Sequence, residues 1–240
     1  MPRVPWLEHQ AWLARNWKPG YHLTIIAPTG TGKSFLSTRG VMPVLGEQER
    51  ALIIDDDAET TVPGFSIKVR SFPNRAWREY FRTRYGSQRY RPIFRLTVPE
   101  DLTAKTIYKQ RQIVYRALRG AFREGNWTIF IPELTMLTDS LADFGLGLKG
   151  VVNILLRRGR RRRVSVVSET QAPRWISRYA LDQPIGVYVA QVGDWDSRIR
   201  LREIGGNSKA LMAALGQLGE HEFVFSGKQG RVLQRVEVGQ

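Results

Sequence analysis

Residues 27–34 carry a pattern that binds phosphate. They read Ala-Pro-Thr-Gly-Thr-Gly-Lys-Ser, with Ala27 in place of the usual first glycine. Backbone N–H groups of such a loop wrap round a β-phosphate, and glycine lets the main chain approach that closely. Lys33 supplies charge between the β- and γ-phosphates, and Ser34 offers its hydroxyl to Mg²⁺. We therefore expect ATP and Mg²⁺ to be held by Pro28, Thr29, Gly30, Thr31, Gly32, Lys33, Ser34 and Phe35.

A carboxylate follows the apolar segment WTIFI at 127–131. Phosphate-loop hydrolases usually end a neighbouring strand in an Asp that helps to hold Mg²⁺, followed in one large division by a Glu that polarises water. Glu133 takes the second position, which predicts a general base that also lies near the metal. The alternative is an exposed carboxylate at a strand end. Pro132 has no side-chain oxygen, so further help to Mg²⁺ must come from elsewhere. Three acidic residues could provide it: Asp55, Asp56 and Glu169.

A polar side chain also ends the apolar segment at 164–168, which runs into Glu169-Thr170-Gln171. At the tip of the strand beside a phosphate loop, such a side chain can touch the γ-phosphate or the attacking water. Gln171 is therefore the candidate sensor. An ordinary loop glutamine is the alternative.

These residues need a framework of strands and helices. Apolar segments predict strands at 21–27, 51–55, 127–131, 164–168, 185–191 and 222–226, with a hairpin return at 231–237. Helical spacing predicts an N-terminal helical segment within 1–20, a helix from Lys33 to about Val41, a long helix capped by Asp101, and a helix that ends at Gly159. Strands that alternate with helices favour a single α/β domain over 1–240, with a mostly parallel sheet covered on both faces.

The charge of the chain indicates a polyanionic partner. Lys and Arg number 37 against 22 Asp and Glu, for a net charge of +15. Six arginines lie between Arg157 and Arg163, and eight more lie in a predicted basic insertion over 70–96. Such clusters are often a solvated face, but the net charge favours contact with the phosphates of a polyanionic partner, which is independent of sequence and sensitive to salt.

Composition excludes several classes of function. The chain has no Cys, and its three scattered histidines do not form a zinc set. It has no apolar run of about 18 residues and no signal-peptide core, so we expect no membrane segment and a cytoplasmic location.

Several segments together resemble the HerA/FtsK family of motor ATPases. They are W-x-x-G-x-H before the first strand, APTGTGKS, the strand ending at Glu133, LLRRGRRRRVSVVSETQAP, and DWDSRIRLREIGG. The resemblance spans about Trp17 to Val238 and is closest to small viral and phage members that package or move DNA. The arginine-rich segment that feeds a strand ending in T-Q-x-P is its sharpest marker.

The resemblance implies a RecA-like (ASCE) three-layer P-loop NTPase that works as a homo-oligomeric ring on double-stranded DNA. It also implies viral capsid or portal partners, and for a viral protein the host cytoplasm. Gln171 is then the sensor, and Arg158 or Arg160 reaches a neighbouring subunit's nucleotide. The chain lacks the family's additional DNA-orienting domain and a nuclease domain, so a bare motor is expected.

Two other functions stay open. One is a nucleotide-dependent phage assembly protein whose cargo is a coat complex. The other is a nucleotide-gated nucleic-acid-binding protein that hydrolyses ATP poorly, which Pro132 supports.

Overall fold

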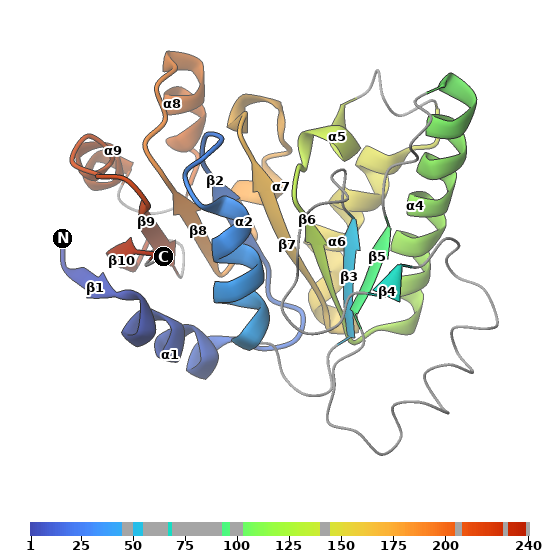
Figure 1. The fold of residues 1–240 in the computed structure, drawn as a ribbon, viewed down its shortest axis with the longest axis horizontal. Coiled ribbons are helices and arrows are strands. Elements are labelled where there is room, and N and C mark those ends of the chain that lie inside the picture. The colour runs from blue at the N-terminus through green and yellow to red at the C-terminus, as the bar shows by residue number, and fades with distance from the viewer. Residues whose placement is uncertain are drawn as a thin grey trace.

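The computed structural model describes residues 1–44, 50–54, 67–68, 93–96, 103–139, 145–204, 208–227 and 230–238. Its strands are β1 (Arg3–Pro5), β2 (Leu23–Ile26), β3 (Arg50–Ile54), β4 (Ile67–Lys68), β5 (Ile93–Leu96), β6 (Trp127–Ile131), β7 (Val164–Thr170), β8 (Gly186–Val189), β9 (Glu222–Gly227) and β10 (Val232–Glu237). Within the described residues they form one sheet in the order β1-β10-β9-β8-β2-β7-β6-β3-β5-β4 (Figure 1).

The centre of this sheet is parallel. Strands β8, β2, β7, β6, β3, β5 and β4 pair in parallel, whereas β9 and β10 form an antiparallel hairpin that continues the sheet beyond β8. The predicted mostly parallel sheet and C-terminal hairpin are therefore confirmed. Strand β1 was not predicted, because three residues are too few to show an alternating pattern; it pairs with β10.

Helices cover both faces of the sheet. They are α1 (Trp6–Asn16), α2 (Lys33–Phe35), α4 (Ala104–Glu124), α5 (Thr135–Thr138), α6 (Leu148–Arg162), α7 (Tyr179–Asp182), α8 (Trp195–Leu201) and α9 (Ser208–Leu215). The chain continues from α2 through a π-helical segment, η1 (Leu36–Val41), and a 3-10 turn, η2 (Met42–Val44); a second 3-10 turn, η3 (Pro173–Trp175), follows β7. None of the described helices combines the length and the apolar character that a membrane span requires.

Alternation along the strands divides the core into two layers. Ile25 of β2 and Val167 of β7 pack in one cluster with α1, α2 and η1, whereas Ile26 and Val166 pack in the other with α4 and α6. The strands are buried on both faces, which explains why they appear in the sequence as continuous apolar runs. This arrangement confirms the predicted three-layer sandwich (Figure 1).

The end of α6 differs from its predicted position. The helix continues past Gly159 to Arg162, and Arg163 takes the left-handed cap conformation with φ of 57°. Gly159 is buried, and a Cβ there would lie 2.5 Å from the carbonyl oxygen of Val164. Its glycine therefore allows α6 to pack against the start of β7 and does not end the helix.

Two further predictions concern the N-terminal cap of α4 and the basic insertion over 70–96. Helix α4 is capped by the Thr103 side chain, which accepts from the Thr106 N–H at 3.3 Å, and not by Asp101. Asp101, residues 55–57 and residues 70–92 lie outside the described residues. Residues 93–96, which the predicted basic insertion included, form β5 in the central sheet beside β3.

Candidate nucleotide-binding site

The phosphate loop joins β2 to α2, as predicted. Gly30 and Gly32 have φ of 79° and 91°, a left-handed backbone that glycine adopts without strain. The Pro28 carbonyl oxygen accepts hydrogen bonds from the Thr31 hydroxyl at 2.7 Å and from Lys33 Nζ at 2.9 Å. The loop thus folds back on itself and holds the lysine ammonium inside its curve.

Lys33 is buried and lies near two carboxylates. Its side chain is 8% exposed, and burial lowers its pKa, while the carboxylates of Glu169 and Glu133 act in the opposite direction. The Lys33 ammonium therefore lies near the carboxylate of Glu169, which belongs to β7, and that of Glu133, which follows β6. The sheet order explains this, because β7 lies between β2 and β6 and the C-terminal ends of all three meet at one edge.

Glu133 is held at this edge by backbone and side-chain donors. Its Oε1 accepts from the Thr135 N–H at 3.2 Å and from the Thr135 hydroxyl. Its Oε2 accepts from the Gln171 N–H at 3.4 Å. The half-buried carboxylate therefore lies beside the sensor position and close enough to Lys33 to influence its pKa.

Gln171 connects the end of β7 to the phosphate loop. Its Oε1 accepts from the Thr29 hydroxyl at 2.8 Å, and the side chain is exposed. Because its backbone also contacts Glu133, Gln171 bridges the loop and the carboxylate. Gln171 therefore lies at the phosphate loop, where the sequence predicts a sensor of the γ-phosphate.

Glu169 is the most buried of these groups, with 3% of its side chain exposed. Its Oε1 accepts from the Ser37 hydroxyl at 2.5 Å, and its Oε2 accepts from the Ser34 hydroxyl at 3.4 Å. Burial raises its pKa to about 7, against the lowering effects of the Ser37 hydrogen bond and the Lys33 charge. From the sequence alone, Glu169 is one of three acidic residues that could help to hold Mg²⁺ in place of the missing Asp at position 132.

The oxygen donors at this edge fit Mg²⁺. Hydroxyl and carboxylate oxygens are its preferred ligands, and it is usually held by one or two carboxylates together with phosphate oxygens of the substrate. The Ser34 hydroxyl and the Glu169 carboxylate are in contact. In the described part of the chain no group of three or more His, Cys, Asp or Glu side chains forms a separate metal cage.

Two residues lie near the phosphate loop although no motif in the sequence places them there. Ser37 lies one turn beyond the motif, in the π-helical segment η1, and its contact with Glu169 depends on the sheet order. His221, just before β9, has a positive φ of 57°, and its Nδ1 lies 3.5 Å from the Thr31 carbonyl oxygen. Nothing local to either residue relates it to a phosphate loop.

Arg158 and Arg160 lie at the opposite edge of the sheet. They belong to the last turns of α6, which ends just before β7 begins, whereas the phosphate loop follows the C-terminal end of β2. The length of β7 separates the two edges by roughly 20 Å. Neither arginine therefore reaches the phosphate loop of its own chain.

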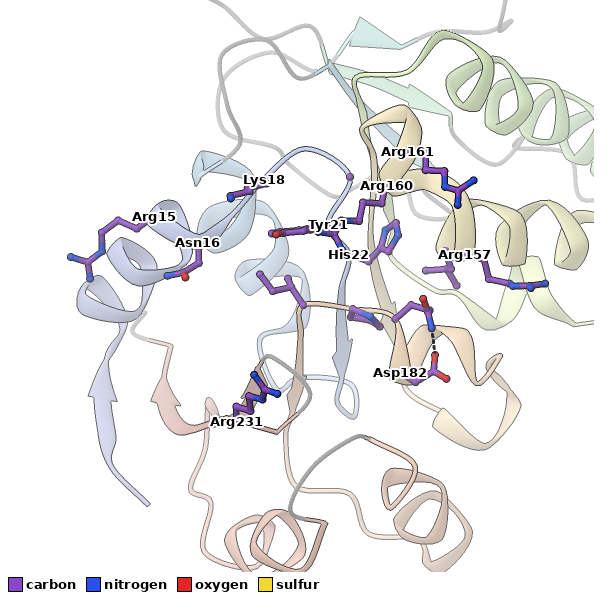
Figure 2. Close-up of a pocket in the computed structure, with 15 residues that line it drawn as sticks. Arg15, Asn16, Lys18, Tyr21, His22, Arg157, Arg160, Arg161, Asp182 and Arg231 are labelled. Atoms are coloured by element: carbon purple, nitrogen blue, oxygen red, sulfur yellow. Dashed lines mark hydrogen bonds between the residues drawn. The ribbon is translucent and has the colours of Figure 1, made fainter.

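A basic hollow of about 840 Å³ surrounds Arg160 (Figure 2). Its cationic lining residues come from α1, α6 and two turns: Arg15, Lys18, Arg157, Arg160, Arg161 and Arg231. Among the described residues that line it, Asp182 is the single acidic one, and it is paired with Arg178 at 3.6 Å. Arg158 does not line this hollow but faces a smaller one with Arg157 and Arg161.

The W-x-x-G-x-H segment positions this hollow. A Cβ on Gly20 would lie 2.8 Å from the Cα of Arg160, so only glycine lets the loop before β2 pack on the arginine backbone. His22 accepts from the Val166 N–H at 3.0 Å, and burial lowers its pKa to about 4, so the ring is neutral near pH 7. The segment thus fixes Arg160 relative to the sheet.

Comparison with known proteins gives matches in structure only. No protein-family model and no curated protein matches the chain. The genome-packaging NTPase B204 from Sulfolobus turreted icosahedral virus 2, solved with AMPPCP, has a TM-score of 0.62 at 12% identity, covering 90% of this chain and 97% of B204. VirB4 of Thermoanaerobacter pseudethanolicus gives 0.64 at 14% identity, covering 91% and 89%.

A third match is the pCW3 conjugation coupling protein TcpA in its monomer form with ATPγS, with a TM-score of 0.52 at 15% identity, covering 94% of this chain and 60% of TcpA. At these identities the likeness shows the fold. The chain therefore has the P-loop α/β fold of the viral packaging NTPase B204, which is the fold that its resemblance to HerA/FtsK motors implies.

Proposed function

We propose that this protein is an ATP-hydrolysing motor that moves DNA, in viral genome packaging or a related DNA transfer. The observation that carries the proposal is the meeting of Lys33, Glu133 and Gln171 at one sheet edge, although they come from three separate segments. B204, whose fold the chain shares, is a genome-packaging NTPase.

Each group has a task in the reaction of ATP with water. Glu133 accepts a proton from the water while the water oxygen forms a bond to the γ-phosphorus, and the bond from that phosphorus to the β,γ-bridging oxygen breaks. Lys33 and the loop N–H groups stabilise the charge that builds on the phosphate oxygens, so ADP and phosphate leave. Gln171 orients the water or contacts the γ-phosphate. The Ser34 hydroxyl would hold Mg²⁺, which would supply positive charge to the phosphates.

The arrangement of the arginines supports an oligomer. Arg160 lies roughly 20 Å from its own phosphate loop, a distance set by the length of β7. It can act on a nucleotide only when a second copy places its loop against the basic hollow. We therefore propose a homo-oligomeric ring in which the hollow faces the neighbour's site, with capsid or portal components as further partners.

The net charge of +15 supports DNA as the cargo. Arg162 ends α6 and Arg163 caps it; both are exposed and neither lines the basic hollow, so they are candidates for contact with DNA phosphates. The competing function of a poorly hydrolysing, nucleotide-gated binding protein is favoured by Pro132. Such a protein would bind nucleotide and DNA as the proposed motor does, but it would hydrolyse ATP much more slowly.

Binding of double-stranded DNA should be independent of sequence and should weaken steeply with salt. A protein that neutralises about six phosphates loses about 10³-fold in affinity between roughly 50 and 200 mM salt. Fluorescence anisotropy with labelled duplexes measures this, and Arg162→Ala and Arg163→Ala should each reduce the salt slope by about 1. Lys209→Ala, which removes an exposed charge from α9, is the matched control. Absence of binding at low salt, or a flat salt dependence, would contradict a DNA motor.

A further inference from the structure

The end of β6 lacks an oxygen where phosphate-loop hydrolases usually carry an Asp. Pro132 stands at that position, directly before Glu133. Such an Asp normally helps to hold Mg²⁺ together with the hydroxyl of the loop's Ser or Thr. Ser34 is the hydroxyl in this chain, so a hydrolysing enzyme needs another carboxylate within reach of it.

Glu169 lies beside the missing carboxylate in the neighbouring strand. Ile131, the last residue of β6, pairs with Ser168 of β7, so Pro132, which directly follows β6, comes alongside Glu169. The two segments stay close beyond that pair, because the Leu134 N–H donates to the Glu169 carbonyl oxygen at 2.8 Å.

Both positions face the layer of α2. Phe130 and Val167, two residues before Pro132 and Glu169, pack in the same core cluster as Leu36 of η1. Side chains two residues apart on a strand lie on one face. A carboxylate at position 132 and the one at position 169 would therefore point toward the same helix.

The order of the strands explains why one carboxylate can replace the other. Strand β7 lies between β6 and β2, and Glu169 is paired with Ile25 of β2. A side chain from position 132 has to cross β7 at residue 169 to reach Ser34. A glutamate at 169 fills that path and reaches Ser34 from one strand nearer, with its Oε2 at 3.4 Å from the hydroxyl.

We infer that Glu169 performs the metal-positioning role that the β6 carboxylate usually has: it orients Ser34 and the oxygen ligands of Mg²⁺ in the nucleotide complex. This inference rests on the proposed function, and it makes Pro132 and Glu169 a coupled pair. Glu169 is a positioning residue, whereas Glu133 keeps the task of accepting the proton. The carboxylate is buried and aimed at the loop, as such a role requires.

The test measures how much Mg²⁺ improves binding of a fluorescent, non-hydrolysable ATP analogue to the full chain, as the ratio of its Kd in EDTA to its Kd in Mg²⁺. Glu169→Gln keeps the size of the side chain and removes its charge. We expect this ratio to fall by about 10-fold to 100-fold, with the Kd in EDTA little changed. Ser168→Ala removes the neighbouring buried hydroxyl of β7, which contacts Thr24 and not Glu169, so it is the control and should keep the ratio.

A transplanted carboxylate separates this role from a structural one. Glu169→Ala should lose the Mg²⁺ effect, and the double variant Pro132→Asp with Glu169→Ala should recover it, because the path across β7 is then open and the oxygen is present again. Pro132→Asp alone should not improve it, since two carboxylates would compete for one space.

The inference is overturned if folded Glu169→Gln protein keeps the wild-type ratio, if Ser168→Ala loses as much, or if the double variant folds without recovering it. The proposed function fails in a distinct way. In that case the wild-type protein itself would show no improvement of nucleotide binding by Mg²⁺.

Discussion

Arg160→Ala should bind ATP as the wild-type protein does and hydrolyse it on the order of 10³ times more slowly. Arg160 lines the basic hollow (Figure 2), which in the proposed ring faces the nucleotide site of the neighbouring subunit. A positive charge there stabilises the transition state without contributing to nucleotide binding in its own subunit. Nucleotide affinity and single-subunit folding should therefore stay unchanged while turnover falls.

Arg158→Ala is the matched control. Sequence reasoning could not separate Arg158 from Arg160, but Arg158 faces the smaller hollow with Arg157 and Arg161. Its removal should cost much less turnover than removal of Arg160. An equal loss in both variants would show that the two arginines act together and would contradict the assignment to Arg160.

Mixed oligomers identify a finger that acts between subunits. A Lys33→Ala subunit keeps its arginines, and an Arg160→Ala subunit keeps its nucleotide site, so activity should return at interfaces that join one of each. If mixed oligomers form and none regains turnover, Arg160 does not act in trans.

Glu133→Gln should bind ATP nearly as tightly as the wild-type protein and lose about 10²-fold to 10⁴-fold in turnover. The amide has the shape of the carboxylate and can still accept from the Thr135 N–H, but it cannot take the proton of the attacking water. Single-turnover phosphate release, measured beside nucleotide affinity, separates the two effects.

Turnover that survives in Glu133→Gln would move the base elsewhere. Glu169 is then the first candidate, because it is the other carboxylate that acts on Lys33. A wild-type protein without turnover, on the other hand, would favour the poorly hydrolysing binding protein that Pro132 suggested.

The phosphate loop could be predicted from sequence because its chemistry is local. All its contacts to phosphate come from consecutive residues between one strand and one helix, so residue type and spacing suffice. Glu133 followed from the carboxylates that usually end a neighbouring strand in phosphate-loop hydrolases. Gln171 followed from its place at the tip of a strand and from the resemblance to HerA/FtsK motors. The structure brings both beside the loop, and their roles stay predictions.

Glu169 could not be assigned in the same way. Its contacts with Ser34 and Ser37 depend on β7 lying next to β2, and strand order is set by packing across the whole domain. The predicted end of α6 was wrong for a different reason. Gly159 looked like a helix stop, but glycine also serves close packing, and only the approach of Val164 shows which use applies. Arg163 then takes the cap position that glycine usually holds.

Coupling between DNA and ATP hydrolysis is measured most directly by the rate of phosphate release with and without double-stranded DNA. The rate should rise when DNA is added at low salt, and the increase should disappear as salt releases the DNA. Lys33→Ala, which removes the charge between the β- and γ-phosphates and should abolish ATP binding, should show no rate in either condition. A wild-type rate that does not change with DNA, at concentrations where DNA is bound, would contradict a DNA-translocating motor.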